Sequence, residues 1–327
     1  MSVSSFSPPN THDLRCYGAF ALIALFLCCD ALRAQAPGVP VYAEGRGSRP
    51  NAALMEQAKK LQGESALLSM TKATEQAMRS ACDLVLPPAD TKPLAGRERW
   101  QRARAGHIRV GQLYLCSKCD RWHLDLSGGY AITADGAVAT CAHVIAPPAD
   151  MKEGWLVAAN EDDVLLPVTE VLACNPGTDS AVIRVKSDKP LTPLPLGVDV
   201  SPGDSVWCFS DPSGKRGYFS EGIVSRFVKR PFMRKKEAEK LPEGAEVPKP
   251  VWLETTTDWA PGSSGSAIID QFGNCVGHVS EIQTVVEEPL PVRKKKAETA
   301  SAQQLGTQIV FHQAIGAVEV RALVKKP

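Results

Sequence analysis

The fold of this chain is decided by one stretch of its sequence, Gly129-Tyr-Ala-Ile-Thr-Ala-Asp-Gly-Ala-Val-Ala-Thr-Cys-Ala-His-Val-Ile145. It predicts a strand, a turn at Asp135-Gly136, and a second strand that ends just before His143. An Asp-Gly pair between two apolar runs is a strong signal for a β-hairpin turn, because both turn positions then tolerate positive φ. The stretch therefore predicts an antiparallel hairpin with a histidine at its exit.

Similar short β runs recur from about residue 106 to the end of the chain. Turn residues separate them, without long helices in between, which is typical of an all-β barrel or sandwich. A last apolar stretch, 310–324, predicts a strand that leads into a helix. The other runs are Leu113–Leu115, Tyr130–Thr133, Ala137–Thr140, Val164–Val168, Ser180–Val185, Ser205–Phe209, Ile223–Val228 and Cys275–Val279.

Length and composition narrow the class of protein. The chain has 327 residues, of which 44% are hydrophobic and 22% charged. These values are close to those of soluble globular domains and argue against a wholly disordered chain. The net charge of +1 argues against a general nucleic-acid binder, and a single long apolar run excludes a membrane protein with many spans.

The first 36 residues predict a secretory signal peptide. A polar start that ends at Arg15 precedes an apolar run of 14 residues, Cys16–Cys29, and an Ala-Gln-Ala site follows at 34–36. Because a spanning helix needs roughly 20 residues, we expect cleavage after Ala36. The alternative is an uncleaved signal anchor, which would be the only contact of the protein with a membrane. The protein is thus expected to be exported, to the periplasm or the medium.

Residues 37–105 predict a linker and a helical extension. Residues 37–50 are rich in Gly and Pro, whereas apolar residues recur at three- and four-residue steps over 51–82, with a break at Gly63. This stripe predicts a helix that packs against the main domain or against another copy, and the second case would give a homo-oligomer through 51–82. Two charged segments, 229–250 and 287–303, are expected to be solvated loop insertions, with docking of an acidic partner as the alternative.

Three residues at the edges of predicted β segments are of the types that acyl transfer by serine requires. His143 ends the hairpin, Asp179 precedes the run Ser180–Val185, and Ser264 lies between glycines. A serine nucleophile needs an imidazole base, and the imidazole needs a carboxylate to orient it. Each segment alone also fits an ordinary structural turn, so the hypothesis of a triad rests on their combination.

The glycines beside Ser264 let the backbone turn sharply. Successive N–H groups of Gly262, Ser263 and Ser264 are then expected to point into a common space, where they would bind an oxyanion.

Five motifs occur in an order that resembles one family. They are Ala134-Asp-Gly136 through Ala142-His143-Val144, Thr178-Asp179-Ser-Ala-Val, Ser210-Asp-Pro-Ser-Gly214, Glu221-Gly-Ile-Val-Ser225 and Pro261-Gly-Ser-Ser264-Gly. Over about residues 110–325 the sequence resembles the chymotrypsin-fold serine proteases, and most closely their exported Do-like (HtrA-type) branch. One departure is Ser266, which stands where the family has a second glycine.

The resemblance implies an all-β fold of two six-stranded antiparallel barrels, with a helical N-terminal extension and a C-terminal helix. It implies a protease domain over 106–327 that cleaves protein or peptide substrates without a cofactor. Because the chain stops just after the closing helix, we expect a member of the branch that has no PDZ-like module. Ser264 would attack, His143 would transfer the proton and Asp179 would orient His143. The competing hypotheses are a non-catalytic peptide-binding or chaperone-like module on the same fold, and an esterase.

Specificity is suggested by residues near the nucleophile. Asp258 lies six residues before Ser264, where the family often has the base of its primary pocket, and an acid there would favour Lys or Arg. The alternative for Asp258 is local hydrogen bonding in a turn. Ser280 is expected on the substrate-binding strand. His278 would either serve acidic substrates or face the core.

The cysteines leave an open question. Seven of the 10 remain after residue 36, and in an exported protein we expect disulfides, with at least one cysteine unpaired. The spacing Cys116-x-x-Cys119-x-x-x-His123 fits either a zinc site that lacks one ligand or a Cys116–Cys119 disulfide. Free thiols are the third reading. Cys141, next to the hairpin exit, is expected to be a buried core residue.

Overall fold

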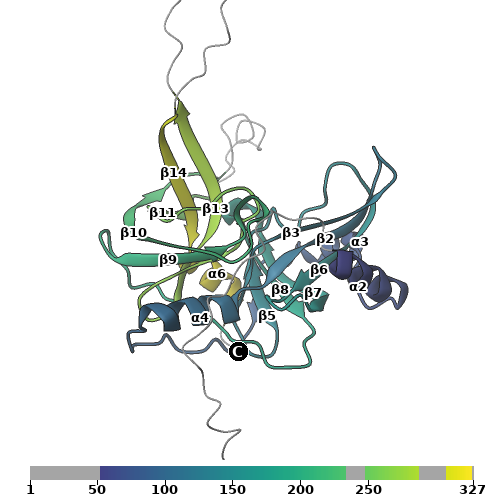
Figure 1. The fold of residues 1–327 in the computed structure, drawn as a ribbon, viewed down its shortest axis with the longest axis horizontal. Helices are drawn as coiled ribbons and strands as arrows, with labels where there is room; N and C mark the ends of the chain where they lie inside the picture. The colour runs from purple at the N-terminus through teal and green to yellow at the C-terminus, as the bar shows by residue number, and fades with distance from the viewer. Residues whose placement is uncertain (1–51, 233–246, 287–306, 326–327) are drawn as a thin grey trace, which may run out of the picture. The chain divides into compact units, whose positions relative to one another are not determined.

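The structure, a computed structural model, describes residues 52–232, 247–286 and 307–325. The predicted signal peptide and most of the two charged insertions lie outside these ranges. Within these ranges, two β units carry the fold, and four α-helices accompany them (Figure 1). None of the helices in the described ranges has the length and apolar character needed to cross a bilayer.

The first β unit is a sheet of seven strands in the order β3-β2-β6-β7-β8-β5-β4. The predicted hairpin is present as β4 and β5, and Tyr130 pairs with Ala139 across it. The sheet curls into a half-barrel of seven strands instead of a closed barrel of six, and the mostly β architecture is consistent with the predicted chymotrypsin-like double barrel. Its strands are β2 (Arg109–Cys116), β3 (Trp122–Ser127), β4 (Tyr130–Ala131), β5 (Ala137–Thr140), β6 (Met151–Ala159), β7 (Leu165–Asn175) and β8 (Ser180–Val185).

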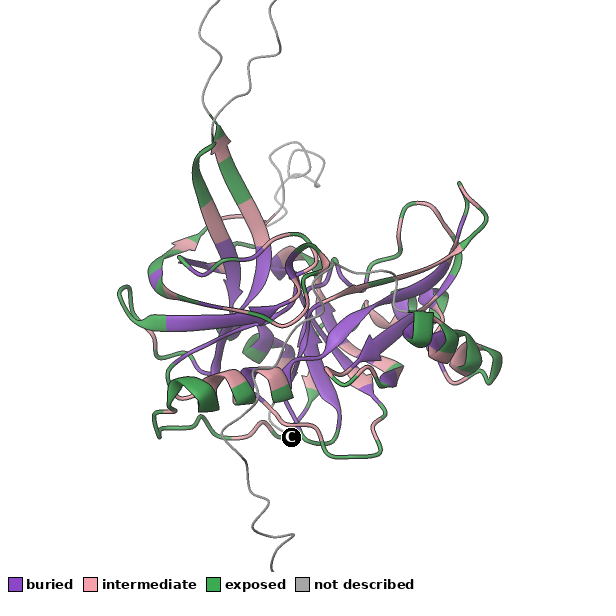
Figure 2. Cartoon of the chain, viewed as in Figure 1, coloured by how far each residue is buried: buried purple, intermediate pink, exposed green. Residues whose placement is uncertain are grey.

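The second β unit is a closed antiparallel barrel in the order β10-β11-β14-β13-β12-β9, as predicted. β13 and β14 run beyond the barrel as a long two-stranded ribbon whose inner half is buried and whose outer half is exposed (Figure 2). The strands are β9 (Ser205–Ser210), β10 (Tyr218–Lys229), β11 (Val251–Thr255), β12 (Ala267–Ile269), β13 (Cys275–Val286) and β14 (Thr307–Gly316).

A shared apolar cluster joins the two β units. It contains Tyr130 and Val182 from the first unit and Phe209 and Ile269 from the second. The C-terminal helix α6 (Ala317–Leu323) adds three buried side chains to the same cluster, those of Ala317, Val320 and Leu323. After α6, β15 (Val324–Lys325) pairs in parallel with β1 (Cys82–Asp83). The predicted strand-then-helix end of the chain is therefore confirmed.

The helical stripe over 51–82 forms two helices that pack on the first sheet. α2 (Ala52–Gly63) ends at the predicted break, and its Leu54 and Ala58 are fully buried against the face formed by β2, β6 and β7. α3 (Met70–Gln76) begins at Ser69, whose side chain accepts the Lys72 N–H at 3.4 Å. Of the two expected partners, the main domain is the one that covers this face.

A third helix, α4 (Gly96–Gly106), was not predicted because it is strongly polar. Side chains hold its two ends: Glu98 accepts the Ala95 N–H at 2.8 Å, and Arg104 pairs with Asp162 at 2.7 Å. The Arg99 guanidinium lies 4.0 Å from the ring centre of Trp207. The helix ends at His107, where the chain enters β2.

Candidate active site

His143 lies in a helical turn directly after β5. Gly136, at φ +101°, closes the preceding hairpin, and a Cβ there would lie 2.3 Å from the Val185 carbonyl oxygen. The Val144 N–H donates to the Cys141 carbonyl at 3.2 Å and the Ile145 N–H donates to the Ala142 carbonyl at 3.3 Å, so the chain turns tightly at His143. The His143 side chain is left 43% exposed, so that it faces both the protein and solvent.

Asp179 is held in an unusual backbone conformation beside His143. It follows the short helix η1 (Pro176–Thr178) and has φ +46° and ψ +41°, in the left-handed region. Asn175 Oδ1 accepts the Gly177 N–H at 3.0 Å and caps this turn. The Asp179 carboxylate is 1% exposed, and both of its oxygens lie 3.0 Å from His143 Nδ1. The His143 backbone N–H donates to Oδ1 at 3.1 Å.

The electrostatics of this pair favour opposite charges. Burial raises the pKa of Asp179, but the hydrogen bonds from His143 and Ser280 outweigh burial, and the net pKa lies below its ordinary value. Burial lowers the pKa of His143, yet the hydrogen bond and charge of Asp179, with a contribution from Glu281, raise it overall. The carboxylate therefore stays ionised and favours a proton on the imidazole.

Two further residues, Ser280 and His278, hold Asp179. Ser280, expected on the substrate-binding strand, is buried in β13 and donates its hydroxyl to Asp179 Oδ2 at 2.6 Å. His278 is fully buried, and its Nε2 donates to the Asp179 carbonyl at 3.1 Å. Burial lowers the pKa of His278, so its ring stays neutral. His278 thus faces the core, the second of its two predicted positions.

The turn around Ser264 has an alternating pattern of amide hydrogen bonds. The Ser263, Gly265 and Ser266 N–H groups donate to the carbonyls of Ala260, Val279 and Ser263 at 2.8–3.0 Å. In the described part of the chain, the N–H groups of Gly262 and Ser264 donate to no protein acceptor. Gly262 has φ +99°, and the Pro261 carbonyl beside it accepts the Ser213 N–H at 2.7 Å. Two amides of the turn are thus free, and that of Ser263 is not.

One carbonyl links the Ser264 turn to the His143 turn. The Val279 carbonyl accepts both the Gly265 N–H, at 2.8 Å, and the Cys141 thiol, at 3.1 Å. A Cβ on Gly265 would lie 2.4 Å from Thr140 Oγ1, so the two turns are in close contact. Ser264 and His143 are neighbours of these contact residues, although their side chains share no hydrogen bond in the structure. Burial raises the pKa of the Cys141 thiol, which fits the predicted core role.

Ser266, the departure from the family pattern, has a buried partner. Its Oγ lies 3.3 Å from His107 Nε2, and His107 Nδ1 lies 2.8 Å from Glu161 Oε1. A Cβ on Gly128 would lie 2.0 Å from Ser266 Oγ, so only glycine fits beside it. This network ties the Ser264 turn to the end of α4.

The Asp258 side chain is exposed, and its backbone is held locally. Its N–H donates to Ser220 Oγ at 3.1 Å, and the Ser220 hydroxyl lies 3.1 Å from its carbonyl. The described structure gives its carboxylate no hydrogen-bond partner.

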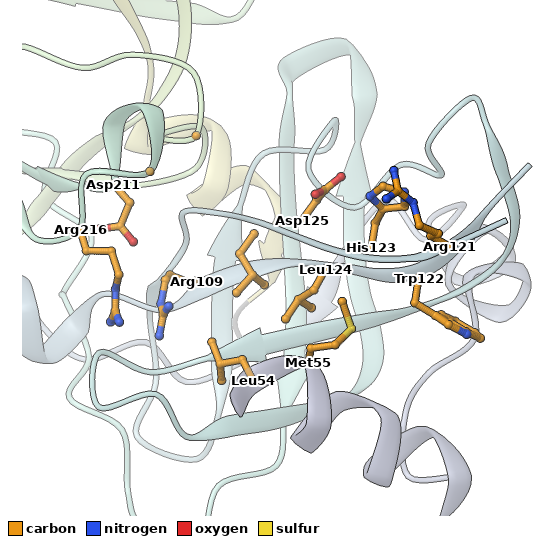
Figure 3. Close-up of a pocket in the computed structure, with 13 residues that line it drawn as sticks. Leu54, Met55, Arg109, Arg121, Trp122, His123, Leu124, Asp125, Asp211 and Arg216 are labelled. Carbon is orange, nitrogen blue, oxygen red and sulfur yellow. The ribbon is translucent and has the colours of Figure 1, made fainter. Parts of the chain in front are cut away.

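A cavity of about 700 Å³ opens beside the Ser264 turn (Figure 3). Its lining includes Gly262 of the Ser264 turn and a continuous run of residues at and along β3, which begins with Arg121. Arg109 and Arg216 point into the space from one side, while Leu54 and Met55 of α2 form a wall. The remaining lining residues are Trp122, His123, Leu124, Asp125, Leu126, Asp211 and Gly214.

The sequence led to an expectation of disulfides, but the structure has none among the described cysteines. All seven cysteines in the described ranges are unpaired. Cys116, Cys119 and His123 are nevertheless brought together, with their ligand atoms within 4.8 Å of one another.

Comparison with known proteins agrees with this architecture. Residues 127–277 match the trypsin-like peptidase domain. The mitochondrial serine protease HTRA2 of Bos taurus is 29% identical over 151 residues, which is 46% of this chain and 30% of that protein. A probable periplasmic DegP-like serine endoprotease of Pseudomonas fluorescens is 28% identical over 160 residues, 49% of this chain and 30% of that protein.

A third relative, the serine protease PepD of Mycobacterium tuberculosis, is 32% identical over 117 residues, 35% of this chain and 24% of that protein. The chain therefore spans less than a third of the length of these relatives. The predicted likeness to HtrA-type serine proteases is confirmed.

Proposed function

We propose that this chain, which carries a trypsin-like peptidase domain, is an exported serine endopeptidase with Ser264 as its nucleophile. The observation that carries the proposal is the His143–Asp179 pair, in which a buried carboxylate holds one ring nitrogen of a half-exposed imidazole. This leaves Nε2 on the side of the ring away from the carboxylate, where it serves as the base.

The reaction would proceed through an acyl-enzyme. His143 Nε2 takes the proton of Ser264 Oγ as that oxygen attacks the scissile carbonyl, and Asp179 keeps the proton on Nδ1 and stabilises the imidazolium. His143 then gives the proton to the leaving amine. A water molecule, activated by the same imidazole, hydrolyses the acyl group from Ser264.

The oxyanion of the intermediate would be bound by two backbone amides. We assign this role to Gly262 and Ser264, because their N–H groups have no protein acceptor, whereas that of Ser263 donates to Ala260. Each such donor contributes roughly 2.7–4 kcal/mol to stabilising the transition state. The bond from Ser213 to the Pro261 carbonyl fixes the orientation of the peptide that ends in the Gly262 N–H.

The cavity supports a polypeptide as the substrate rather than a small ester. Gly262 and residues of β3 both line it, and its mixture of apolar and charged walls suits an extended chain with varied side chains. Asp258 stays a prediction for selecting Lys or Arg, on the strength of its exposed carboxylate near the Ser264 turn. Export is supported by the predicted signal peptide and by relatives described as periplasmic.

The test is the variant Ser264→Ala, compared with the wild type. We expect the wild type to cleave casein and to react with a fluorophosphonate probe, and the variant to lose at least about 10⁴-fold in kcat while keeping the wild-type fold. Ser225→Ala, on the exposed surface of β10, is the matched control and should keep full activity. Peptide binding without turnover in a folded wild type would favour the non-catalytic module instead.

A further inference from the structure

The tip of the hairpin between β2 and β3 gathers four side chains that ligate metals. Cys116 ends β2, Cys119 lies in the turn, and His123 lies in β3. Cys119 Sγ is 3.1 Å from His123 Nε2. The fourth residue, Asp150, comes from the segment just before β6, and its Oδ2 lies 3.4 Å from Cys116 Sγ. Asp150 contacts the Cys116 thiol but lies outside the group of three whose ligand atoms are all within 4.8 Å of one another, so its side chain would have to turn toward an ion to complete the set.

Two of the separations match those between the ligand atoms of a tetrahedral zinc site. Bonds of about 2.3 Å to sulfur and about 2.0–2.1 Å to nitrogen or oxygen place neighbouring ligand atoms about 3.5 Å apart. The measured distances of 3.1 and 3.4 Å are close to this edge length. The other pairs among Cys116, Cys119 and His123 lie within 4.8 Å, which a metal would draw together by small side-chain rotations.

The backbone of the hairpin fixes the ligands in place. The Lys118 N–H donates to Cys116 Sγ at 3.4 Å, and the Ser117 N–H donates to the Asp150 carbonyl at 2.6 Å, which ties the turn to the segment before β6. Asp120, at φ +53°, turns the chain back toward β3. None of these contacts requires the cysteines to be joined.

The surroundings also orient the His123 ring. The His123 ring stacks on Tyr114 with ring centres 5.2 Å apart, and the Tyr114 hydroxyl donates to Asp125 at 3.1 Å. Such outer contacts orient the ring of a ligating histidine.

We propose that Cys116, Cys119, His123 and Asp150 bind one Zn²⁺ ion that clamps the hairpin tip to the segment before β6. Two thiolates, one neutral imidazole and one carboxylate form a donor set that suits zinc, which accepts sulfur, nitrogen and oxygen ligands in four-coordinate sites. The three negative charges exceed the charge of the ion by one, and the Lys118 ammonium, 3.7 Å from Asp150, balances it. The site is separate from the proposed catalytic residues.

The experiment measures metal uptake by the full chain. Wild-type protein, reduced and freed of metal by a chelator, should take up one equivalent of Zn²⁺. Co²⁺ in its place should give the strong visible absorption of a four-coordinate site and a charge-transfer band from the thiolates. Because uptake is read independently of proteolysis, a failure here is distinguishable from a failure of the proposed function.

Three single variants test the individual ligands: Cys119→Ser, His123→Gln and Asp150→Asn. All three positions are partly exposed, so the variants should fold, and circular dichroism checks that they do. Each should weaken Zn²⁺ binding at least about tenfold in competition with a chelator. Cys82→Ser, which changes a cysteine outside the cluster, is the matched control and should bind as the wild type does.

Two outcomes would overturn the site. One is Zn²⁺ uptake that Cys119→Ser and His123→Gln leave unchanged. The other is a Cys116–Cys119 disulfide that forms in air despite equimolar Zn²⁺, seen as a loss of two hydrogens in mass and of two alkylatable thiols. Binding unchanged by Asp150→Asn would overturn the assignment of Asp150.

Discussion

At the scale of single residues, Asp179 is the most constrained side chain of the candidate site. Its carboxylate accepts hydrogen bonds from the His143 ring, the His143 backbone N–H and the Ser280 hydroxyl. Its backbone carbonyl accepts a hydrogen bond from the His278 ring. A carboxylate with several donors stays ionised even when it is buried. Asp179 therefore has the surroundings of a fixed negative charge that orients His143 and favours its protonated form.

The raised pKa of His143 predicts the pH dependence of activity. The imidazole acts as a base only when it is neutral, so kcat/KM should rise as the pH passes through this pKa, with a midpoint above the ordinary value of 6.5. Asp179→Asn removes the charge that raises the pKa and should lower both the midpoint and the activity, the latter by about 10⁴-fold.

The titration itself is followed by NMR of the histidine rings in the Ser264→Ala protein, with and without Asp179→Asn. His312, whose pKa is lowered by burial, does not contact Asp179 and serves as the internal control. A His143 pKa that the asparagine leaves unchanged would contradict the assigned pairing.

The sequence could single out His143, Asp179 and Ser264 as candidates because each lies in a local motif with its own turn chemistry. It could not assign Ser280 to Asp179, since 101 residues separate them and the packing of the second barrel against the first sheet brings them together. It also could not place Asp150 beside Cys116, because 34 residues separate them and the pairing of β2 with β6 brings them together.

At the scale of elements, the Ser264 turn is held by strands of both β units and by the end of α4. Gly128 donates its N–H to the Ser264 carbonyl at 2.8 Å, and the Thr140 hydroxyl donates to the Gly128 carbonyl at 2.7 Å. On the other side, Ser266 contacts His107. Hydrogen bonds therefore hold the turn on both sides of Ser264, which favours a turn conformation that is already formed before substrate binds.

Ser266→Ala tests the brace between this turn and α4. The change leaves His107 Nε2 without its buried partner, so the free energy of unfolding in urea should fall by about 1–3 kcal/mol. Ser225→Ala, at an exposed position, should change it by no more than about 0.5 kcal/mol. Equal effects of the two substitutions would show that the contact between Ser266 and His107 contributes nothing to stability.

The β runs and the hairpin turn were predictable because alternation and Asp-Gly chemistry are local signals. α4 was not, because only Ala103 and Gly106 of its residues are buried and its stability comes from capping and ion pairs with distant residues. The sequence also could not predict that the first sheet does not close into a barrel, because the number of strands and the closure depend on which strands pair at the edges of the sheet.

At the scale of the whole molecule, the N-terminal helices belong to the packing of the first β unit. α2 covers Leu113 and Val157 on one face of its sheet, and α3 adds Met70 and Ala73 to the cluster on the other side. The apolar stripe could not say whether the main domain or a second copy would cover it. The structure shows that the main domain does so.

Leu54→Ala tests this role of α2. The side chain is fully buried, so its truncation should lower the free energy of unfolding of the full chain by about 2–5 kcal/mol. Lys60→Ala, on the exposed face of the same helix, should have an effect within about 0.5 kcal/mol. If the two variants unfold at the same denaturant concentration as the wild type, α2 is not part of the cooperative unit.

The walls of the cavity beside Gly262 have a consequence for selective inhibition. Most of its lining residues, among them Leu54, Met55, Arg109 and Trp122, precede residue 127, where the match to the peptidase domain begins. An inhibitor that contacts only Ser264 and His143 would bind residues within the part of the chain that matches the peptidase domain. A compound directed at Ser264 that extends along β3 toward α2 would instead contact residues outside the matched peptidase domain, and selectivity is to be sought there.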